Sequence, residues 1–328
     1  MADARRALIT GATGQDGRLL SRLLRLEGYD VAGTSRTTDD GVSAEGVPLH
    51  RCSLRDDAEA TALVAALRPH EIYNFAAFST GSGMFDDPVA MGDVNGLGPV
   101  RLLEAIRRVD PSIRFFQASS SEMFGRRSPA PQGPTTPLDP RSPYGTAKQY
   151  AHVMVDVYRK HHGLFACSGI LFNHESPLRP PAFVTRKVVR AAVMIAAGRA
   201  DHVVLGDLDA RRDWGHARDH VRAAWMMLQA EQPTDQVIAT GVTHSIRDLA
   251  ALAFTAVGLD YRDHVRIDPT FRRPSESVAL VGDPSSLRAL GWQPEVGFAD
   301  LIAEMVAAEQ HILNDTTVKG TSLDVPKG

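Results

Sequence analysis

The fold is decided by a stretch close to the N-terminus, Gly11-Ala12-Thr13-Gly14-Gln15-Asp16-Gly17. An apolar run at residues 7–9 precedes it and predicts a buried strand, and the apolar spacing at residues 19–26 predicts a helix that begins near Arg18. Glycines between a strand and a helix let the backbone turn tightly and approach a ligand, while the helix N-terminus offers unpaired N–H groups to an anion. The stretch therefore predicts a dinucleotide-binding turn.

Beyond this turn, apolar runs alternate with helical patterns through the first 240 residues. Strands are expected at residues 7–9, 30–33, 71–75, 113–116 and 167–172, and helices at residues 19–26, 100–109 and 150–158. Such alternation indicates an α/β fold, a Rossmann-type doubly wound parallel sheet with helices on both faces. Proline-rich segments at 128–143 and 177–181 are expected to be loops over the carboxyl ends of the strands, where sheets of this type bind ligands.

Composition narrows the class of protein. The 328 residues are 43% hydrophobic with a formal net charge of -3, which suits a globular protein and gives no basic surface for nucleic acid. No apolar run is long enough to span a membrane and no signal peptide is recognised, so a cytoplasmic location is expected. The cysteines, Cys52 and Cys167, lack a partner motif and are expected to be buried thiols.

The cofactor's identity is suggested by the end of the second expected strand. Arg36 follows this strand and is expected to pair with a 2′-phosphate, while no acidic residue stands at the strand end to bind a ribose hydroxyl. This arrangement favours NADP, with NAD as the alternative. Asp39 and Asp40 lie nearby and weigh against the preference for NADP.

A Tyr-x-x-x-Lys pair, Tyr144 and Lys148, marks the candidate chemistry. Lys148 is one of only five lysines in the chain. A tyrosine and a lysine four residues apart share a helix face, so the ammonium is expected to lower the phenol pKa and to hold a ribose hydroxyl of the cofactor. Upstream, Ser120 is placed to bind the same substrate oxygen as Tyr144. This trio predicts hydride transfer from an alcohol carbon to a nicotinamide.

Glu122 adds a function that a simple dehydrogenase does not need. A carboxylate beside a transient ketone can remove the acidified proton on the neighbouring carbon, which opens a route to elimination of water.

These motifs resemble those of the GDP-mannose 4,6-dehydratase family of extended short-chain dehydrogenases/reductases. The resemblance covers about residues 5–312, and further similar segments lie at residues 169–177, 183–187, 208–216, 273–276 and 291–294. It implies a Rossmann domain and a smaller C-terminal α/β domain for the nucleotide sugar. The expected bounds are residues 1–172 plus about 215–262 for the first domain, about 173–214 plus 263–313 for the second, and a flexible tail at 314–328.

The resemblance also implies roles for individual residues. Catalysis would involve Ser120, where the family usually has threonine, together with Glu122, Tyr144 and Lys148. Cofactor binding would involve Tyr144, Lys148 and the residues Gly11, Gly14, Gln15, Asp16, Gly17, Arg36 and Ala76. The nucleotide sugar would be bound by Ser79, Asn173, Lys187, Arg212, Arg273 and Glu276. The implied enzyme is a hydro-lyase that oxidises C4, eliminates water across C5 and C6, and returns the hydride to give a 4-keto-6-deoxy sugar.

Departures from the family pattern keep other interpretations open. Residues 78–84 lack the family's histidine and contain two glycines, which puts mannose in question, and Ser53 replaces an aspartate expected near the adenine. The loop between the second and third strands is short, so a homodimer through the helices containing residues 93–109 and 144–162 is expected, with a tetramer as the alternative.

Several alternative functions follow from these departures. The same fold could serve a dehydratase of another nucleotide sugar or nucleoside, with elimination that stops at an alkene, or an epimerase or decarboxylase. A non-catalytic cofactor-binding regulator is disfavoured by the intact catalytic set. His216 and His220 are four residues apart but lack the glutamate of a zinc motif, so they are expected on a helix face or as caps, and no metal is expected.

Overall fold

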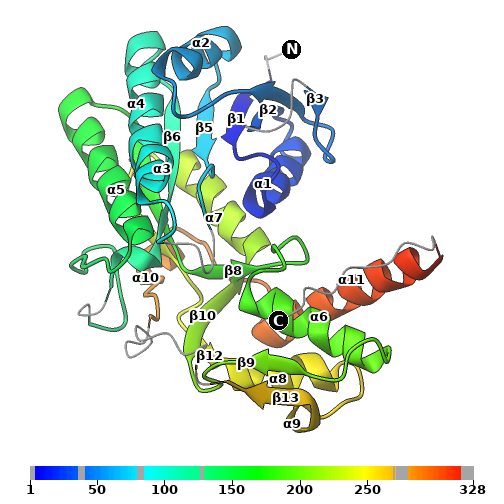
Figure 1. Cartoon of the computed structure of the whole chain (residues 1–328). Coiled ribbons are helices and arrows are strands. Elements are labelled where there is room, and N and C mark those ends of the chain that lie inside the picture. Colours follow the sequence, from blue (N-terminus) through cyan, green and yellow to red (C-terminus); the bar gives the residue numbers. More distant parts are fainter. Residues whose placement is uncertain are drawn as a thin grey trace.

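The computed structural model describes residues 4–35, 41–79, 85–125, 129–268, 270 and 280–318, with side chains up to 315. It contains an eight-stranded main sheet (Figure 1). The strands occur in the spatial order β11 (Gln236–Ile238), β7 (Ala166–Leu171), β6 (Arg114–Ser120), β5 (Glu71–Asn74), β1 (Arg6–Thr10), β2 (Asp30–Ser35), β4 (Pro48–Arg51) and β3 (Gly41–Val42). All neighbours are parallel except β3, which is antiparallel to β4.

Strand β1 lies at the point where the strand order reverses. Leu8 is beside Ala32 of β2 on one side and Ile72 of β5 on the other. The chain moves outward from β1 to β2 and β4 in one direction, and to β5, β6 and β7 in the other. Ligands of open α/β sheets bind at such a switch point, beyond the carboxyl ends of the strands. The glycine turn follows β1 directly and is therefore placed at the expected ligand site.

Helices cover both faces of the sheet (Figure 1). Helices α1 (Gln15–Leu26) and α7 (Ala217–Gln229) pack on one face and bury Leu20 and Met227. Helices α2 (Asp57–Leu67), α4 (Gly98–Val109) and α5 (Pro143–His162) pack on the other and bury Val64, Leu102 and Val155. Each fully buried side chain of this size contributes about 1.5–3 kcal/mol. The predicted doubly wound fold is confirmed.

A second lobe lies beyond the carboxyl ends of the main sheet (Figure 1). Its strands form two small sheets, β12 (Thr243–Ser245), β10 (Arg211–His216) and β8 (Asn173–Glu175), and β13 (Val265–Ile267) with β9 (Val203–Leu205). Its helices are α6 (Val184–Ala196), α8 (Ile246–Thr255), α9 (Tyr261–His264) and α11 (Phe298–Val318). A separate apolar core formed largely by α6, α8 and α11 holds this lobe together.

The packing of the two lobes differs from the expected domain bounds. Helix α8 falls within the stretch assigned to the first domain, but its apolar face is buried against α6 and α11 in the second lobe. Conversely, Trp292 and the short helix α10 (Ser285–Ala289) pack on the first lobe, where the Trp292 indole donates a hydrogen bond to the Asp219 carbonyl. Helix α11 continues to Val318, so the first residues of the expected tail are helical.

The structure differs from the sequence prediction in two short strands and in the residues at which two helices begin. Strands β4 and β11 are short, and neither was predicted. Helix α1 begins at Gln15, three residues before Arg18, because Gly14 already occupies its N-cap position. Helix α5 begins at Pro143, where the Ser142 hydroxyl accepts a hydrogen bond from the Gly145 amide.

Residues 129–142 and 177–181 lie in no helix or strand, as predicted for the two proline-rich segments, whereas Pro143 begins helix α5. Three short helical turns complete the fold: α3 (Pro88–Met91), the π-helical turn η1 (Gly92–Leu97) and the 3-10 turn η2 (Ser121–Met123). Both cysteines are buried thiols, as expected. Among the described residues, no helix has the length and apolar character needed to cross a membrane.

Candidate active site

The glycine turn approaches the neighbouring strand more closely than a side chain would allow. Gly11 has a φ of +71°, and a Cβ at this position would lie 2.9 Å from the Ala76 backbone nitrogen. Only glycine combines this left-handed backbone with the close approach. The turn therefore lies directly against the segment after β5, and the two together form the floor of a ligand cavity.

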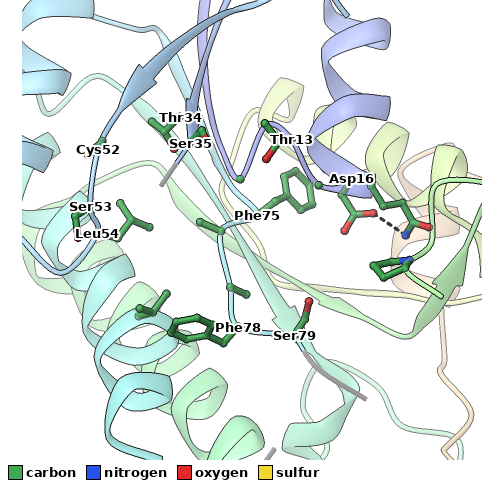
Figure 2. A pocket seen from close by; sticks show the side chains of 18 of the residues that line it. Thr13, Asp16, Thr34, Ser35, Cys52, Ser53, Leu54, Phe75, Phe78 and Ser79 are labelled. Carbon is green, nitrogen blue, oxygen red and sulfur yellow. Dashed lines mark hydrogen bonds between the residues drawn. The ribbon is translucent and has the colours of Figure 1, made fainter. Parts of the chain in front are cut away.

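Two cavities adjoin at the carboxyl ends of the strands. The first, of about 330 Å³, extends from the glycine turn to Ser35 and Ser53 at the ends of β2 and β4. Figure 2 shows Ser35 and Ser53 on one side of this cavity and Asp16 on the other. The second, of about 140 Å³, is lined by Ser120, Glu122, Tyr144, Lys148 and Asn173, among others. Asp16 and Ser79 line both, so the two cavities share a wall.

The start of helix α5 is held close to the turn η2. A Cβ at Gly145 would lie 2.6 Å from the Glu122 backbone oxygen, so glycine is needed after Tyr144 for this contact. The Ser120 hydroxyl accepts a hydrogen bond of 3.2 Å from the Glu122 amide. These contacts place Ser120, Glu122 and Tyr144 around one small cavity, although they come from separate parts of the chain.

Burial dominates the electrostatics of the Tyr144 hydroxyl. Burial raises the Tyr144 pKa to about 12, and a hydrogen bond between the hydroxyls of Ser120 and Tyr144 opposes the increase. The charge of Glu122 raises the Tyr144 pKa further, whereas that of Arg179 lowers it. At neutral pH the phenol is therefore protonated, and it can become a base only when a ligand or a cation stabilises its phenolate.

Lys148 lies beside Tyr144, as its position four residues further along α5 predicts. The ammonium nitrogen lies 5.8 Å from the centre of the Tyr144 ring and donates a 2.7 Å hydrogen bond to the Ala118 carbonyl. Lys148 is itself buried, and burial lowers its pKa to about 8 while the charge of Asp16 opposes the decrease. Lys148 thus lines the second cavity beside Tyr144, and burial disfavours the charged form of both groups.

The side chains of Gln15 and Asp16 connect the glycine turn to the second lobe. The Gln15 amide donates a hydrogen bond of 3.1 Å to the His174 carbonyl and accepts one of 2.8 Å from the Ser176 hydroxyl. Asp16 forms an ion pair of 3.0 Å with the His174 ring. These contacts fix the glycine turn relative to strand β8, which carries Asn173, and both Gln15 and Asp16 also line the first cavity.

In the Asp16–His174 pair each partner favours the charged form of the other, against the effect of burial. Burial alone would raise the Asp16 pKa, but the charge and hydrogen bond of His174, with help from Arg179, lower it to about 2. Burial alone would lower the His174 pKa, but Asp16 raises it. The second ring nitrogen of His174 lies 2.7 Å from the Phe172 carbonyl oxygen, so both nitrogens face acceptors, as in an imidazolium.

We expect Asp16→Asn to lower the free energy of unfolding by about 2 kcal/mol near pH 5.5. The folded Asp16 pKa lies below its ordinary value of 3.8, so its contribution is present above that pH and is lost as the pH falls towards 2. The folded His174 pKa lies above its ordinary value of 6.5, so its contribution is present below that pH and is lost as the pH rises through the folded pKa. Urea unfolding between about pH 4 and pH 9 measures the difference.

The matched control for this change is Asp30→Asn, which alters an exposed aspartate at the start of β2 in the same way. We expect it to have little effect at any pH. A deficit of Asp16→Asn that is independent of pH would show that the ion pair does not carry the stability.

Arg179 is a residue of the site that the sequence analysis did not identify. It lines both cavities, stacks at 3.6 Å over the Phe183 ring and forms a 3.1 Å ion pair with Glu175. The signal was present, because Arg179 is the one cation in the segment 177–181, which was already predicted to lie over the strand ends. His174 was not identified either, although it directly follows the predicted site residue Asn173.

Some of the remaining predicted site residues line the cavities, and others lie outside them or outside the described part of the chain. Ala76 lines the first cavity, Ser79 both, and Asn173 the second. Lys187 and Arg212 lie in the second lobe, outside the lining of both cavities; the Lys187 ammonium donates a 2.9 Å hydrogen bond to the Val204 carbonyl. Three predicted residues lie outside the described part of the chain: Arg36, Arg273 and Glu276.

The two histidines at the start of α7 have structural contacts. His216 caps this helix, as predicted, by accepting a 2.9 Å hydrogen bond from the Arg218 amide. His220 stacks on His174 with ring centres 4.7 Å apart. In the described ranges, no group of three His, Cys, Asp or Glu side chains is arranged to hold a metal ion.

The fold and the site define the class of protein, an extended short-chain dehydrogenase/reductase with a glycine turn and a Ser, Tyr and Lys set around adjoining cavities. Comparison with known proteins narrows the class. A family described as GDP-mannose 4,6 dehydratase matches residues 8–305. The chain belongs to this family.

Curated relatives span nearly the whole chain. The GDP-mannose 4,6-dehydratase of Vibrio cholerae is 40% identical over 357 residues, which cover 94% of this chain and 96% of the relative. The GDP-mannose 4,6 dehydratase 1 of Arabidopsis thaliana is 43% identical over 319 residues, covering 92% and 88%.

Solved structures share the fold. The UDP-glucose 4-epimerase of Thermus thermophilus, in complex with NAD, is 27% identical with a TM-score of 0.82, covering 93% of this chain and 99% of that one. A dTDP-glucose 4,6-dehydratase from Streptomyces venezuelae is 22% identical with a TM-score of 0.82, covering 93% and 97%. The second likeness bears on the fold alone.

Proposed function

We propose that the chain is a nucleotide-sugar 4,6-dehydratase of the GDP-mannose type, a hydro-lyase that converts a hexose into a 4-keto-6-deoxy sugar. Its family and the names of its relatives support this function. The observation that carries it is the presence of Glu122 in the same cavity as Ser120, Tyr144 and Lys148. Proton removal from carbon needs a carboxylate of this kind beside the oxidising site, whereas transfer of hydride alone does not.

The proposed cofactor is a nicotinamide dinucleotide that occupies the first cavity. The close approach at Gly11 and the N-terminus of α1 fit a pyrophosphate, and the cavity leads from there to the catalytic residues. Gly14, Gly17 and Ala76 would line its path. When bound, such a cofactor accepts hydride from C4 of the sugar and returns it to C6. We propose NADP rather than NAD, with Arg36 as the residue that suggested it.

Tyr144 is proposed as the residue that removes the proton from the 4-hydroxyl. Ser120 would bind the same oxygen, because its hydroxyl is already hydrogen-bonded to that of Tyr144. Lys148, four residues on and directed into the cavity, would hold a ribose hydroxyl. Arg179 would stabilise the phenolate, since its charge lowers the Tyr144 pKa.

Glu122 is proposed as the base that removes the C5 proton once C4 is a ketone. The ketone makes this proton acidic, and departure of the 6-hydroxyl as water completes the elimination. The same carboxyl or a neighbouring acid would protonate the leaving group. Return of hydride to C6 and of a proton to C5 then gives the product with no net redox change.

The second lobe is proposed to bind the nucleotide. Asn173 lines the catalytic cavity and Ser79 its shared wall with the cofactor cavity. Lys187 and Arg212 belong to this lobe and would bind the diphosphate, with Arg273 and Glu276 completing the set as the family resemblance implies. The first lobe would then hold the cofactor, and the second lobe would hold the nucleotide of the substrate.

We propose that two copies associate through helices α4 and α5, with a tetramer as the alternative. Along α5, Tyr150, Val153 and Val157 are exposed at a spacing that puts them on one helix face, and Leu97, the last residue of η1 before α4, is exposed too. An apolar stripe of this kind usually marks an interface. Sedimentation of the purified chain as a monomer would exclude the proposal.

The reaction is tested by incubating the protein with GDP-mannose and NADP in heavy water, followed by mass spectrometry. We expect a product lighter by one water that carries a single deuterium at C5, because proton removal and return exchange this position with solvent. A C4 epimer or an alkene would instead support an epimerase or an arrested elimination. Failure of a cofactor-loaded chain to convert GDP-mannose would contradict the proposed substrate, and other nucleotide sugars would then be compared.

A further inference from the structure

Arg55 lies at the end of the cofactor cavity that is farthest from the catalytic residues. It follows β4 and lines the first cavity together with Ser35, Ser53 and Leu54. Figure 2 shows the side chains of these three neighbours on the side of the cavity opposite Asp16. A dinucleotide with its pyrophosphate on the glycine turn places its adenosine at this end, beyond the carboxyl ends of β2 and β4. Arg55 is therefore a candidate to contact the adenosine half.

The Arg55 side chain is held in place by the π-helical turn η1. Its Nε donates a 2.8 Å hydrogen bond to the Asp93 carboxylate. The other oxygen of Asp93 forms a 2.8 Å ion pair with Arg101, which also donates a 2.9 Å hydrogen bond to the Leu54 carbonyl. Arg55 and Arg101 together lower the Asp93 pKa. Two guanidinium groups thus share one carboxylate, which leaves an excess positive charge at this wall.

The nearby carboxylates of α2 do not cancel this charge at the cavity. Asp56 caps α2 and accepts hydrogen bonds from the amides of Ala58 and Glu59. The Glu59 carboxylate accepts a 2.8 Å hydrogen bond from the Ser53 amide. Neither carboxylate belongs to the cavity lining. These acids are engaged by backbone donors, whereas Arg55 has its two terminal nitrogens without a hydrogen bond to the described residues.

The charged residues that line the first cavity are few and are separated along it. Asp16 and Arg179 also line the catalytic cavity and so mark the nicotinamide end. Among the lining residues that the structure describes, Arg55 is the charged side chain of the adenosine end. A ligand with an anionic group on its adenosine would meet this cation there, whereas a ligand without one would leave it exposed to water.

We propose that Arg55 binds the 2′-phosphate of NADP and is thereby a determinant of cofactor preference. The proposal rests on the proposed use of a nicotinamide cofactor and goes beyond it by naming a cation from the β4 side of the cavity. The planar guanidinium is suited to a phosphate, and the bond of its Nε to Asp93 orients the two terminal nitrogens in advance. Arg36 lies outside the described residues.

The test compares the binding of NADPH and NADH to the wild-type protein and to Arg55→Ala, measured by fluorescence titration without any sugar substrate. We expect the dissociation constant for NADPH to rise about tenfold or more, because charge-assisted hydrogen bonds to the phosphate are lost. That for NADH should change by less than about twofold. Arg55→Lys keeps the charge but not the planar fork, and should bind NADPH with intermediate affinity.

Arg108→Ala is the matched control, because it removes an exposed arginine of α4 that is paired with Asp57 and lies outside the cavity lining. It should leave both dissociation constants unchanged. Equal weakening of NADPH and NADH in Arg55→Ala would overturn the assignment, since it would place Arg55 on the adenosine that both cofactors share. An unchanged NADPH affinity would overturn it too. Failure of the proposed reaction would show separately, as absence of a dehydrated product while cofactor binding persists.

Discussion

Replacement of Tyr144 by phenylalanine is expected to lower kcat for dehydration by about three orders of magnitude, within the range of about 10²–10⁴-fold that general acid–base groups contribute. The change removes the hydroxyl that is hydrogen-bonded to Ser120 and keeps the buried ring. Without the phenol, no group at this position can take the proton from the 4-hydroxyl. Steady-state assays of the dehydrated product, together with titration of the cofactor, measure the two effects separately.

Binding of the cofactor should be nearly unaffected in Tyr144→Phe, since the glycine turn and Lys148 are unchanged. Tyr150→Phe provides the control, because it makes the same chemical change to an exposed tyrosine of the same helix. A Tyr144→Phe enzyme that retains activity within about tenfold of the wild type would remove Tyr144 from the chemistry. Loss of cofactor binding in the variant would show a structural role instead.

The arrangement of the main sheet followed from the sequence because its signals are local. Strands β1 and β7 consist largely of small and apolar residues, and the chain direction between such runs is fixed by the intervening helices. The same logic failed for β4 and β11. Their four and three residues carry too little pattern, and both form because a neighbouring strand supplies a partner.

The limits of the second lobe could not be predicted because they depend on packing between distant segments. Nothing within α8 indicates that its buried face will meet α6 and α11 instead of the main sheet. Trp292 likewise returns to the first lobe through contacts with α7. Which lobe a segment packs against depends on complementary apolar surfaces from distant parts of the chain, and the hydrophobic periodicity within one segment does not determine it.

The candidate site likewise contains residues that were predicted from the sequence and residues that were missed. Ser120 ends strand β6, Glu122 lies two residues further on, and Tyr144 and Lys148 are four residues apart on α5. Their roles were therefore predicted from their positions in the sequence together with the family resemblance. Two electrostatic partners were missed because they reach the site from the second lobe: Arg179, whose charge acts on Tyr144, and His174, which pairs with Asp16. The shifts that burial causes in the pKa values of Tyr144 and Lys148 were not predicted either, because the sequence shows which charges are near but not how deeply they are buried.

Buried charge is therefore the main property of this site that only the structure reveals. The mutual contact of Asp16 and His174 shifts both towards their charged forms, while burial shifts Tyr144 and Lys148 towards their neutral forms. A bound ligand that brings charge into the cavities would change this balance. The site is thus expected to gain its reactive protonation state when the cofactor and substrate are bound, not before.

Replacement of Glu122 by glutamine is expected to stop the loss of water, with a decrease in kcat of about 10³-fold. Glutamine keeps the size of the side chain but cannot accept a proton from C5. Oxidation at C4 depends on Tyr144, Ser120 and Lys148, so it should still proceed. Bound cofactor should then accumulate in its reduced form, visible in its absorbance after a single addition of GDP-mannose.

Deuterium incorporation from heavy water distinguishes a specific block of elimination from a general loss of activity. If Glu122 removes the C5 proton, the recovered sugar of the Glu122→Gln enzyme should carry no deuterium at C5, although its cofactor has been reduced. Glu231→Gln, which alters an exposed glutamate, should behave as the wild type. An unchanged rate of dehydration would exclude Glu122 as the base. Absence of both cofactor reduction and exchange would place Glu122 in substrate binding, because elimination cannot be the blocked step when oxidation has not occurred.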